Sequence, residues 1–417
     1  MTAPRMRVIL GILLCTATLL NYLDRLAIGI VSVEIRQQFS LTESDYGRIL
    51  FFFFLSYSIM YAGSGWLVDK LGTRAGFAAF IAGWSVAQML HGFAAGFASL
   101  AAFRFLLGAA EPGAWPAAAK AVREWIPPAR RALYMGIFNA GSSLGSALAP
   151  IVVGWITLIY SWRASFVATG VLGLVWLIAW LKFYRSPQPG EGAAATEEPE
   201  IQGRPWIQLI RTRACLTLTL ARFFTDPVIY FIIFWLPDYL RKERGFDLAL
   251  VRDYAWAPFV VGGIGYVLGG WLSGRLMQAG WTLPRARKFG MACGAAIMPF
   301  AILAPFVPNA ALAIAAACCI TLGHALWTSN LQTLPADLYH GKEVGSVMGC
   351  SGSGGAIAGM FAQLGTGWMV MHFSYAPIFI VAGLMHPLSA LLVYRLLPDR
   401  YFPAETRLAA AVSLKAS

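Results

Sequence analysis

The sequence predicts an all-α membrane protein with twelve transmembrane helices arranged as two pseudo-symmetric six-helix bundles. Of its 417 residues, 58% are hydrophobic and only 12% are charged, which lies far outside the range of soluble proteins. Apolar runs of about 20 residues, long enough to cross roughly 30 Å of hydrocarbon, recur along the whole chain. A polar segment at 186–212 divides these runs six and six.

The apolar runs are continuous rather than alternating at every second residue, so they predict helices and not the strands of a β-barrel. Their approximate ranges are 8–33, 47–68, 75–95, 97–121, 133–156, 165–184, 214–240, 253–278, 287–306, 310–334, 344–370 and 376–396. We therefore expect an N-terminal six-helix bundle at 1–185, a cytoplasmic linker at 186–212, a C-terminal bundle at 213–399 and a cytoplasmic tail at 400–417. Arg5 and Arg7 precede the first run as in a signal peptide, but no small-residue cleavage site precedes Asn21, so we expect this run to be retained as helix 1.

The net charge of +12 does not indicate a nucleic-acid partner, because of where the basic residues lie. When the loops are assigned alternately to two sides, most of their Lys and Arg residues fall on the side of the termini. The positive-inside rule then places both termini and the linker in the cytoplasm. The basic excess would meet the anionic headgroups of the lipid bilayer.

The residue types that carry catalysis or bind metals show no useful spacing. All six cysteines lie in apolar runs, and we interpret them as small core residues. The five histidines supply neither a nucleophile–base pair nor a metal-ligand set, so an enzyme is disfavoured, and we predict no catalytic residue, metal or cofactor. A membrane sensor is disfavoured because only short tails flank the predicted helices.

Ionisable residues in the middle of two apolar runs are the first functional candidates. Asp24 and Arg25 lie within the run at 8–33, where a charge costs several kcal/mol unless it is paired or faces a polar cavity. Arg104 and Glu111 are seven residues apart, so they project from one helix face at depths about 10 Å apart. Pro112 and Gly113 are expected to loosen the helix just beyond the acid. The alternative is a purely structural ion network.

The loop after the second run carries a recognisable motif. Residues 65–74 read G-W-L-V-D-K-L-G-T-R. This segment resembles the major facilitator superfamily, whose loop between helices 2 and 3 carries G-x-L-x-D-x-x-G-x-R. The resemblance implies that the loop latches the two halves together on the cytoplasmic side, through Gly65, Asp69, Gly72 and Arg74.

The second half of the chain echoes the first. Residues 270–275, G-W-L-S-G-R, repeat 65–70 at an offset of 205, and Met348-Gly349 repeats Met135-Gly136 at an offset of 213. Two halves related by duplication suit a transporter whose site lies at their interface. Gly274 stands where the first half has Asp69, so we expect the second latch to be weaker.

Polar residues in four further runs complete the candidates. Tyr57 and Tyr61, one turn apart, line a cavity or anchor packing, and Asn139 contacts a ligand or a neighbouring helix; both pairs of alternatives stay open. Arg222 and Asp226 are four apart and are expected to pair on one helix face, one turn before Tyr230. The cluster of His324, Trp327 and Asn330 indicates a ligand-facing surface.

Buried arginines and acids together suit the transport of an organic anion with protons. Arginine matches the geometry of a carboxylate with two parallel hydrogen bonds. An Asp or Glu whose arginine partner changes between conformations can take up and release a proton. Entry of a proton with the anion offsets the cost of moving the anion against an inside-negative potential.

Four motifs look like those of the anion:cation symporter branch of the superfamily. They are N-Y-L-D-R at 21–25, R-x-x-x-G-x-x-E at 104–111, G-I-F-N-x-G-S at 136–142 and A-R-F-F-T-D-P at 221–227. The last, together with Gly323-His324, Asn330 and L-P-A-D at 334–337, is similar to bacterial hexuronate transporters. The resemblance implies proton-coupled uptake of a small sugar acid such as glucuronate or galacturonate by a monomer in the bacterial inner membrane. The alternative is another organic anion (aldonate, aldarate, tartrate or an aromatic carboxylate), or exchange without net proton flow.

The resemblance also assigns roles to individual residues. Asp24 and Glu111 would be the proton-coupling acids. The arginines Arg25, Arg104 and Arg222 would interact with the substrate carboxylate and with these acids. The rest of the predicted substrate site comprises Tyr22, Tyr57, Asn139, Asp226, Tyr230, His324, Trp327 and Asn330. Ala325-Leu326 and Cys350 depart from the expected pattern, which affects the identity of the sugar more than the mechanism.

Overall fold

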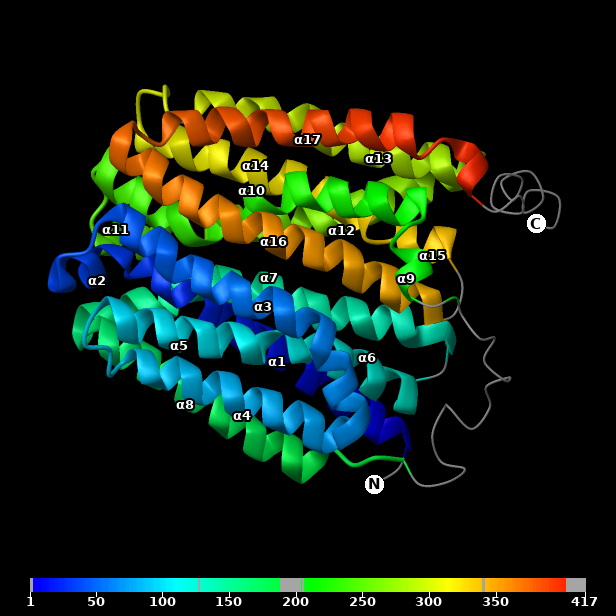
Figure 1. Ribbon diagram of the computed structural model, residues 1–417, viewed down its shortest axis with the longest axis horizontal. Coiled ribbons are helices and arrows are strands. Elements are labelled where there is room, and N and C mark those ends of the chain that lie inside the picture. The colour runs from blue at the N-terminus through cyan, green and yellow to red at the C-terminus, as the bar shows by residue number, and fades with distance from the viewer. Residues whose placement is uncertain (1–2, 127, 188–203, 205, 340–341, 403–417) are drawn as a thin grey trace. The chain divides into compact units, whose positions relative to one another are not determined.

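The computed structural model describes residues 3–126, 128–187, 204, 206–339 and 342–402, and within these ranges the secondary structure is helical (Figure 1). Of the predicted linker (186–212) and the predicted tail (400–417), residues 188–203, 205 and 403–417 lie outside the described residues. The helices are α1 (Ala3–Ile30), α2 (Ser32–Phe39), α3 (Glu43–Leu71), α4 (Thr73–His91), α5 (Phe97–Ala110), η1 (Glu111–Gly113), α6 (Ala114–Trp125), α7 (Pro128–Ile159), α8 (Trp162–Phe183), α9 (Trp206–Leu209), α10 (Arg213–Arg244), α11 (Leu248–Tyr254), α12 (Ala257–Gln278), α13 (Leu283–Ile297), η3 (Met298–Leu303), α14 (Ala310–Leu331), α15 (Leu334–Leu338), α16 (Lys342–His372), α17 (Ala376–Leu396) and η4 (Asp399–Tyr401).

Each predicted apolar run coincides with a helix or with consecutive helices, so the predicted all-α membrane fold is confirmed. Among the described residues, 8 helical segments are long and apolar enough to cross a membrane by length and composition alone. The run at 97–121 is interrupted where the sequence predicts it: α5 ends at Ala110, and Glu111 begins a single 3₁₀ turn that contains Pro112.

The chain forms two compact units. The first takes its described residues from Met1–Glu200, Ile233–Trp256 and Gln363–Met371, and the second from Ile201–Ile232, Ala257–Ala362 and His372–Ser417. Segments of α10 and α16 therefore contribute to both units. Because this grouping follows contacts rather than chain order, the predicted halves at 1–185 and 213–399 stay a prediction.

Glycines allow close helix crossings in the first unit. A Cβ atom on Gly141 or Gly145 of α7 would lie well inside 3.0 Å of the α1 backbone, at the carbonyl oxygens of Cys15 and Leu19. Gly108 of α5 meets the carbonyl of Phe53 on α3 in the same way. Also in this unit, α4 and α8 lie side by side (Figure 1). These crossings hold α1, α3 and α5 close enough for their buried polar side chains to meet.

The second unit is built around α12, α13, α14, α17 and parts of α10 and α16. Its core includes Leu218, Met291, Trp327, Leu331 and Val393. Gly354 packs against Thr219, and Gly355 against the carboxylate of Asp226. The glycine-rich segment at 351–355 is thus a closely packed part of α16, and it leaves room for an acidic side chain.

The internal repeat is visible in matching contacts of the two units. Glu124 accepts hydrogen bonds from Thr73 and from the Tyr184 hydroxyl. At the corresponding place 213 residues later, Asp337 accepts a bond of 2.9 Å from Arg287. Asp337 lies beyond the end of α14, and its burial raises the pKa of its carboxyl against the opposing effect of Arg287. The duplicated chain has kept an acid at this position and changed its partners.

Candidate functional site

The centre of the first unit holds a buried ion pair between α1 and η1. The Nε and Nη2 atoms of Arg25 donate to Oε2 of Glu111 at 2.8 and 2.5 Å. Both side chains are almost completely buried, with exposed fractions of 4% and 0%. Oε1 of Glu111 has no hydrogen-bond partner among the described residues. Arg104, seven residues before Glu111, does not form this pair.

Aromatic rings surround the Arg25 guanidinium. Its central carbon lies 4.8 Å from the ring centroid of Tyr22 and 5.0 Å from that of Tyr57. Phe53 and Trp115 follow at 5.7 and 5.9 Å. Ring faces attract a cation and fix its position without neutralising it. Arg25 is therefore held in place while its guanidinium keeps the charge that an anion would recognise.

Asp24 and Arg104 lie beside this pair without ordinary ion-pair contacts. Both oxygens of Asp24 and all three guanidinium nitrogens of Arg104 lack hydrogen-bond partners within the described ranges. The two side chains are 1% and 0% exposed. Asp24, Glu111 and Arg25 all lie within electrostatic range of Arg104. A buried charge without hydrogen bonds destabilises the folded state. The burial of Asp24 and Arg104 is therefore not explained by folding stability alone.

The predicted pair on α10 is confirmed in the second unit. Arg222 contacts Asp226 at 2.9 Å, with the acid 6% and the base 16% exposed. Gly355 faces the same carboxylate. Tyr230, one turn further along α10, is half-buried.

The three polar residues of α14 are buried inside the second unit. His324 contacts His386 and Thr328, each at 3.1 Å. Asn330 donates to the carbonyls of Gly269 and Leu326 and so joins α14 to α12. Trp327 is 0% exposed and belongs to the core. Their predicted contact with substrate stays a prediction, and in this structure Asn330 has a clear packing role.

The remaining predicted site residues are distributed as follows. Tyr22 is half-buried and Tyr57 is buried, and both contact the Arg25 guanidinium. Asn139 is exposed on α7. In the loop between α3 and α4, Gly72 has φ 78°, which favours glycine, and the Arg74 side chain donates to the carbonyl of Leu181. The latch function of Gly65, Asp69, Gly72 and Arg74 stays a prediction.

Sequence reasoning missed several polar residues of α4 and α8. Gln88 and His91 are 0% exposed, and so is Thr169. Gln88 donates to the Thr169 hydroxyl at 3.0 Å. A glutamine in the middle of an apolar run was a detectable signal, whereas a threonine in such a run is ordinary. Trp115 was also missed, because only the fold brings it to Arg25.

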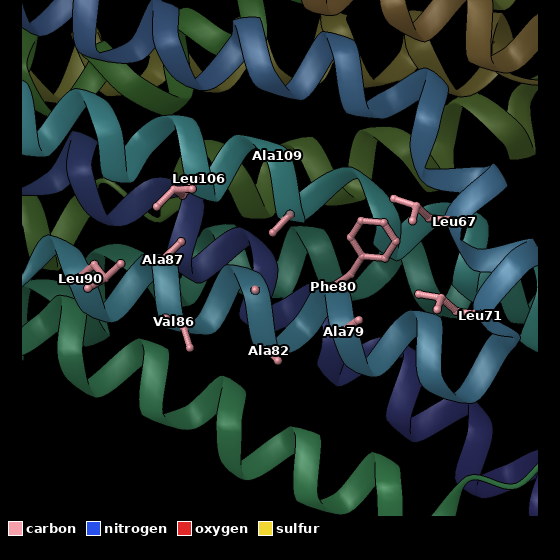
Figure 2. A pocket seen from close by; sticks show the side chains of 12 residues that line it. Leu67, Leu71, Ala79, Phe80, Ala82, Val86, Ala87, Leu90, Leu106 and Ala109 are labelled. Atoms are coloured by element: carbon pink, nitrogen blue, oxygen red, sulfur yellow. The ribbon is translucent and has the colours of Figure 1, made fainter.

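One cavity of about 590 Å³ lies between α3, α4 and α5 (Figure 2). Its lining contains no ionisable side chain; the labelled residues in Figure 2 include Leu67, Phe80, Val86, Leu90 and Leu106. Such a surface suits hydrocarbon rather than a sugar acid. Among the described residues, no group of three or more His, Cys, Asp or Glu side chains could hold a metal ion.

Comparison with known proteins identifies relatives over almost the whole chain. The family model described as Major Facilitator Superfamily matches residues 14–362 and 279–414. The hexuronate transporter of Escherichia coli K12 is 28% identical over 402 residues, covering 93% of each chain. The probable sulfoacetate transporter SauU of Cupriavidus necator is 31% identical and covers 92% of each.

Solved structures with the same fold also exist. A bacterial homologue of the human lysosomal transporter Spinster, in its inward-facing and occupied conformation, matches with a TM-score of 0.73. The match covers 97% of this chain and 98% of that one at 18% sequence identity.

Proposed function

This chain belongs to the major facilitator superfamily, and from that premise we propose that it is a proton-coupled symporter that carries a sugar acid into the cell by alternating access. The substrate class we favour is a hexuronate such as glucuronate or galacturonate. Both termini would lie in the cytoplasm, on one side of a bacterial inner membrane. Protons would be the coupling ion, with no other cofactor.

The Arg25–Glu111 ion pair is the observation that carries the proposal. Two guanidinium nitrogens of Arg25 are engaged by one carboxylate oxygen. A substrate carboxylate would need the same nitrogens, because bidentate contact is how arginine recognises such groups. Protonation of Glu111 removes its charge and releases Arg25 for the substrate. Proton uptake would therefore favour anion binding, which is the physical basis of coupling.

Asp24 supplies a second proton-binding candidate next to the first. It lies close enough to Glu111 and Arg104 to interact electrostatically with both. Two neighbouring acids titrate as one coupled set rather than independently. Entry of one or two protons with a monoanion would offset about 2.3 kcal/mol per charge at a membrane potential of 100 mV.

The sugar-acid assignment rests on the relatives and on the aromatic surroundings of Arg25. Relatives of this chain are named as transporters of hexuronate, of D-galactonate and of sulfoacetate. All three names describe small organic anions. The rings of Tyr22, Tyr57 and Trp115 offer flat faces and two hydroxyls next to a cation. The second candidate is therefore another small organic anion, an aldonate or sulfoacetate among them.

The first test is uptake of labelled glucuronate into proteoliposomes with an imposed inward proton gradient. We expect accumulation that a protonophore abolishes and that unlabelled galacturonate inhibits. A panel with galactonate and sulfoacetate would identify the substrate if neither hexuronate is carried. Lack of gradient-driven uptake for every anion in the panel would contradict proton-coupled symport.

The Glu111→Gln variant tests the coupling step. The amide resembles the protonated acid, so we expect accumulation driven by the proton gradient to be lost while counterflow exchange of labelled substrate continues. Asp253→Asn, at an acid paired only with its neighbour Arg252 in the described structure, is the control and should accumulate substrate normally. Accumulation by Glu111→Gln at the wild-type level would exclude this role.

A further inference from the structure

An apolar groove lies next to the turn that begins with Glu111. It is the cavity of about 590 Å³ between α3, α4 and α5. Gly83 lets α4 approach α5 closely, because a Cβ atom on Gly83 would lie 3.2 Å from the Cβ atom of Ala110. Half of the residues that line the groove are small: Ala79, Ala82, Gly83, Ala87, Ala109 and Ala110. The small side chains therefore leave a hollow between helices that are themselves in contact.

The groove opens on an apolar surface. Leu71 of α3, Val86 of α4 and Leu106 of α5 line it, and each of them is 48% exposed. The three helices correspond to the predicted spans at 47–68, 75–95 and 97–121, so these exposed side chains would meet the hydrocarbon of the bilayer. The molecules that surround the groove in a membrane thus have the same chemistry as its lining.

The length of the groove matches one leaflet of a bilayer. Figure 2 shows Leu67 and Leu71 at one end of the groove and Leu90 at the other. From Ala79 to Leu90, α4 rises by about 16 Å. This rise is roughly half of the hydrocarbon thickness of a bilayer. A single acyl chain of a phospholipid has this reach.

Basic side chains lie at the end of the groove where α3 meets α4. Lys70 precedes the lining residue Leu71 and is exposed, and its Nζ atom lies 5.1 Å from the ring centroid of Trp66. Arg74, in the first turn of α4, is also exposed and donates to the carbonyl of Leu181. Basic residues between helices at the cytoplasmic surface attract anionic headgroups, and tryptophan is typical of the membrane–water interface. A phospholipid whose acyl chain enters at this end would have its phosphate next to Lys70.

We propose that this groove is a binding site for one acyl chain of an anionic phospholipid of the cytoplasmic leaflet, with the headgroup at Lys70. The site is separate from the arginine and aromatic cluster that would hold the transported anion. The hydrophobic effect does not select this lipid, because the acyl chains of the surrounding bilayer are as apolar as the groove. Selectivity comes instead from packing inside the hollow and from the charge at its cytoplasmic end.

An acyl chain in the groove packs against the elements that hold Glu111. Ala110 lines the groove and directly precedes Glu111. Phe80 also lines the groove, and its ring fills the space beside Gly113, where a Cβ atom would lie 2.1 Å from Cγ of Phe80. The bound chain therefore contacts residues next to both ends of the 3₁₀ turn η1, and we expect it to stabilise this part of the first unit.

Native mass spectrometry of the full-length protein, released from detergent micelles, measures the bound lipid. The probes are phosphatidylglycerol and phosphatidylcholine with identical acyl chains. We expect one phosphatidylglycerol per chain to bind about fivefold more tightly than phosphatidylcholine, which is the factor that one basic side chain contributes near an anionic headgroup. Lys70→Gln should remove this preference and leave the binding of phosphatidylcholine unchanged.

Two further variants fill the groove itself. Ala79→Phe fills it from α4 and Ala109→Phe from α5, and each should weaken the binding of both lipids by about tenfold, because the added ring takes the place of part of the acyl chain. Ala315→Phe is the control, since Ala315 is exposed on α14 and lies outside the groove. Phosphatidylglycerol should raise the melting temperature of the wild type and of Ala315→Phe, but not that of Ala79→Phe.

Several outcomes would overturn the proposal. Wild-type affinity for phosphatidylglycerol in both filling variants would show that the groove is not the site. Equal affinities of the wild type for the two lipids would exclude recognition of an anionic headgroup. If both filling variants fail to fold, Lys70→Gln decides, because a preference for phosphatidylglycerol that survives this substitution contradicts the proposed headgroup position. These measurements involve no transport, so their failure is distinct from a failure of the proposed function.

Discussion

Individual residues of the candidate site were predictable to different degrees. Arg222 and Asp226 were expected to pair, because a spacing of four places them on one helix face, and they do. The partner of Glu111 was not predictable, because Arg25 lies on another helix 86 residues away. Spacing along a chain predicts contacts within one helix, whereas contacts between helices depend on how the helices cross.

Arg25→Lys tests the geometry of the central cation. Lysine keeps the charge but has neither the planar fork nor the ring-stacking surface of arginine. A charge-assisted hydrogen bond contributes about 1.5–3 kcal/mol, so we expect KM for a carboxylate substrate to rise by roughly 10- to 100-fold. Uptake kinetics in proteoliposomes would measure this.

Arg48→Lys is the matched control for this variant. Arg48 is 58% exposed and pairs with Asp45 at 3.4 Å, so its replacement should leave KM unchanged. An unchanged KM in Arg25→Lys as well would exclude bidentate recognition of the substrate by Arg25.

At the scale of elements, the apolar runs predicted the long helices well. Continuous runs of about 20 residues became α7, α8, α12 and α14 with little shift at their ends. The segment at 97–121 is three consecutive elements, because Pro112 removes a backbone donor and Glu111 begins a 3₁₀ turn. The short helix α2 follows a long span and is polar in composition, and α11 precedes a long span and has only 7 residues, so neither gave an apolar run of spanning length.

The crossing of α1 and α7 gives a prediction about packing. Gly145→Ala would place a Cβ atom against the α1 backbone at Leu19, where neither partner is a flexible side chain. Overpacking of this kind costs about 1–3 kcal/mol, so we expect a lower melting temperature in detergent.

Gly136→Ala on the same helix is the control, since nothing lies within 4 Å of the added atom. Alanine is the better helix former by roughly 0.5–1 kcal/mol, so this variant should melt at or above the wild-type temperature. Equal melting temperatures for the two variants would contradict a tight crossing at Gly145.

At the scale of the whole molecule, duplication was visible in the sequence and has a structural counterpart. The offset of 213 that relates Met135-Gly136 to Met348-Gly349 also relates Glu124 to Asp337, and both acids accept bonds in the structure. The substrate could not be predicted from the repeat, because substrate choice depends on the positions of side chains from several helices to within about an ångström.

A partly buried set of ion pairs joins distant parts of the chain inside the first unit. Arg36 of α2 bonds to Asp238 of α10 and, at 2.8 Å, to Glu43 of α3. Lys242 also pairs with Glu43, and Arg241 with Glu34. In chain order α10 belongs to the second set of six predicted spans, so alternating access would require this network to break and re-form during each transport cycle.

The Asp238→Asn variant tests how much this network stabilises the observed conformation. Asp238 is 0% and Arg36 6% exposed, so the substitution leaves a buried cation facing a neutral amide. Arg36 keeps its contact with Glu43, so we expect the loss of stability to be below the cost of about 3–5 kcal/mol for a buried charge left without a partner, and the melting temperature to fall by a few degrees. The exposed pair of Arg48 and Asp45 supplies the comparison, because Arg48→Gln should cost at most about 1 kcal/mol. Equal melting temperatures for Asp238→Asn and Arg48→Gln would show that the observed conformation does not depend on the Arg36–Asp238 pair.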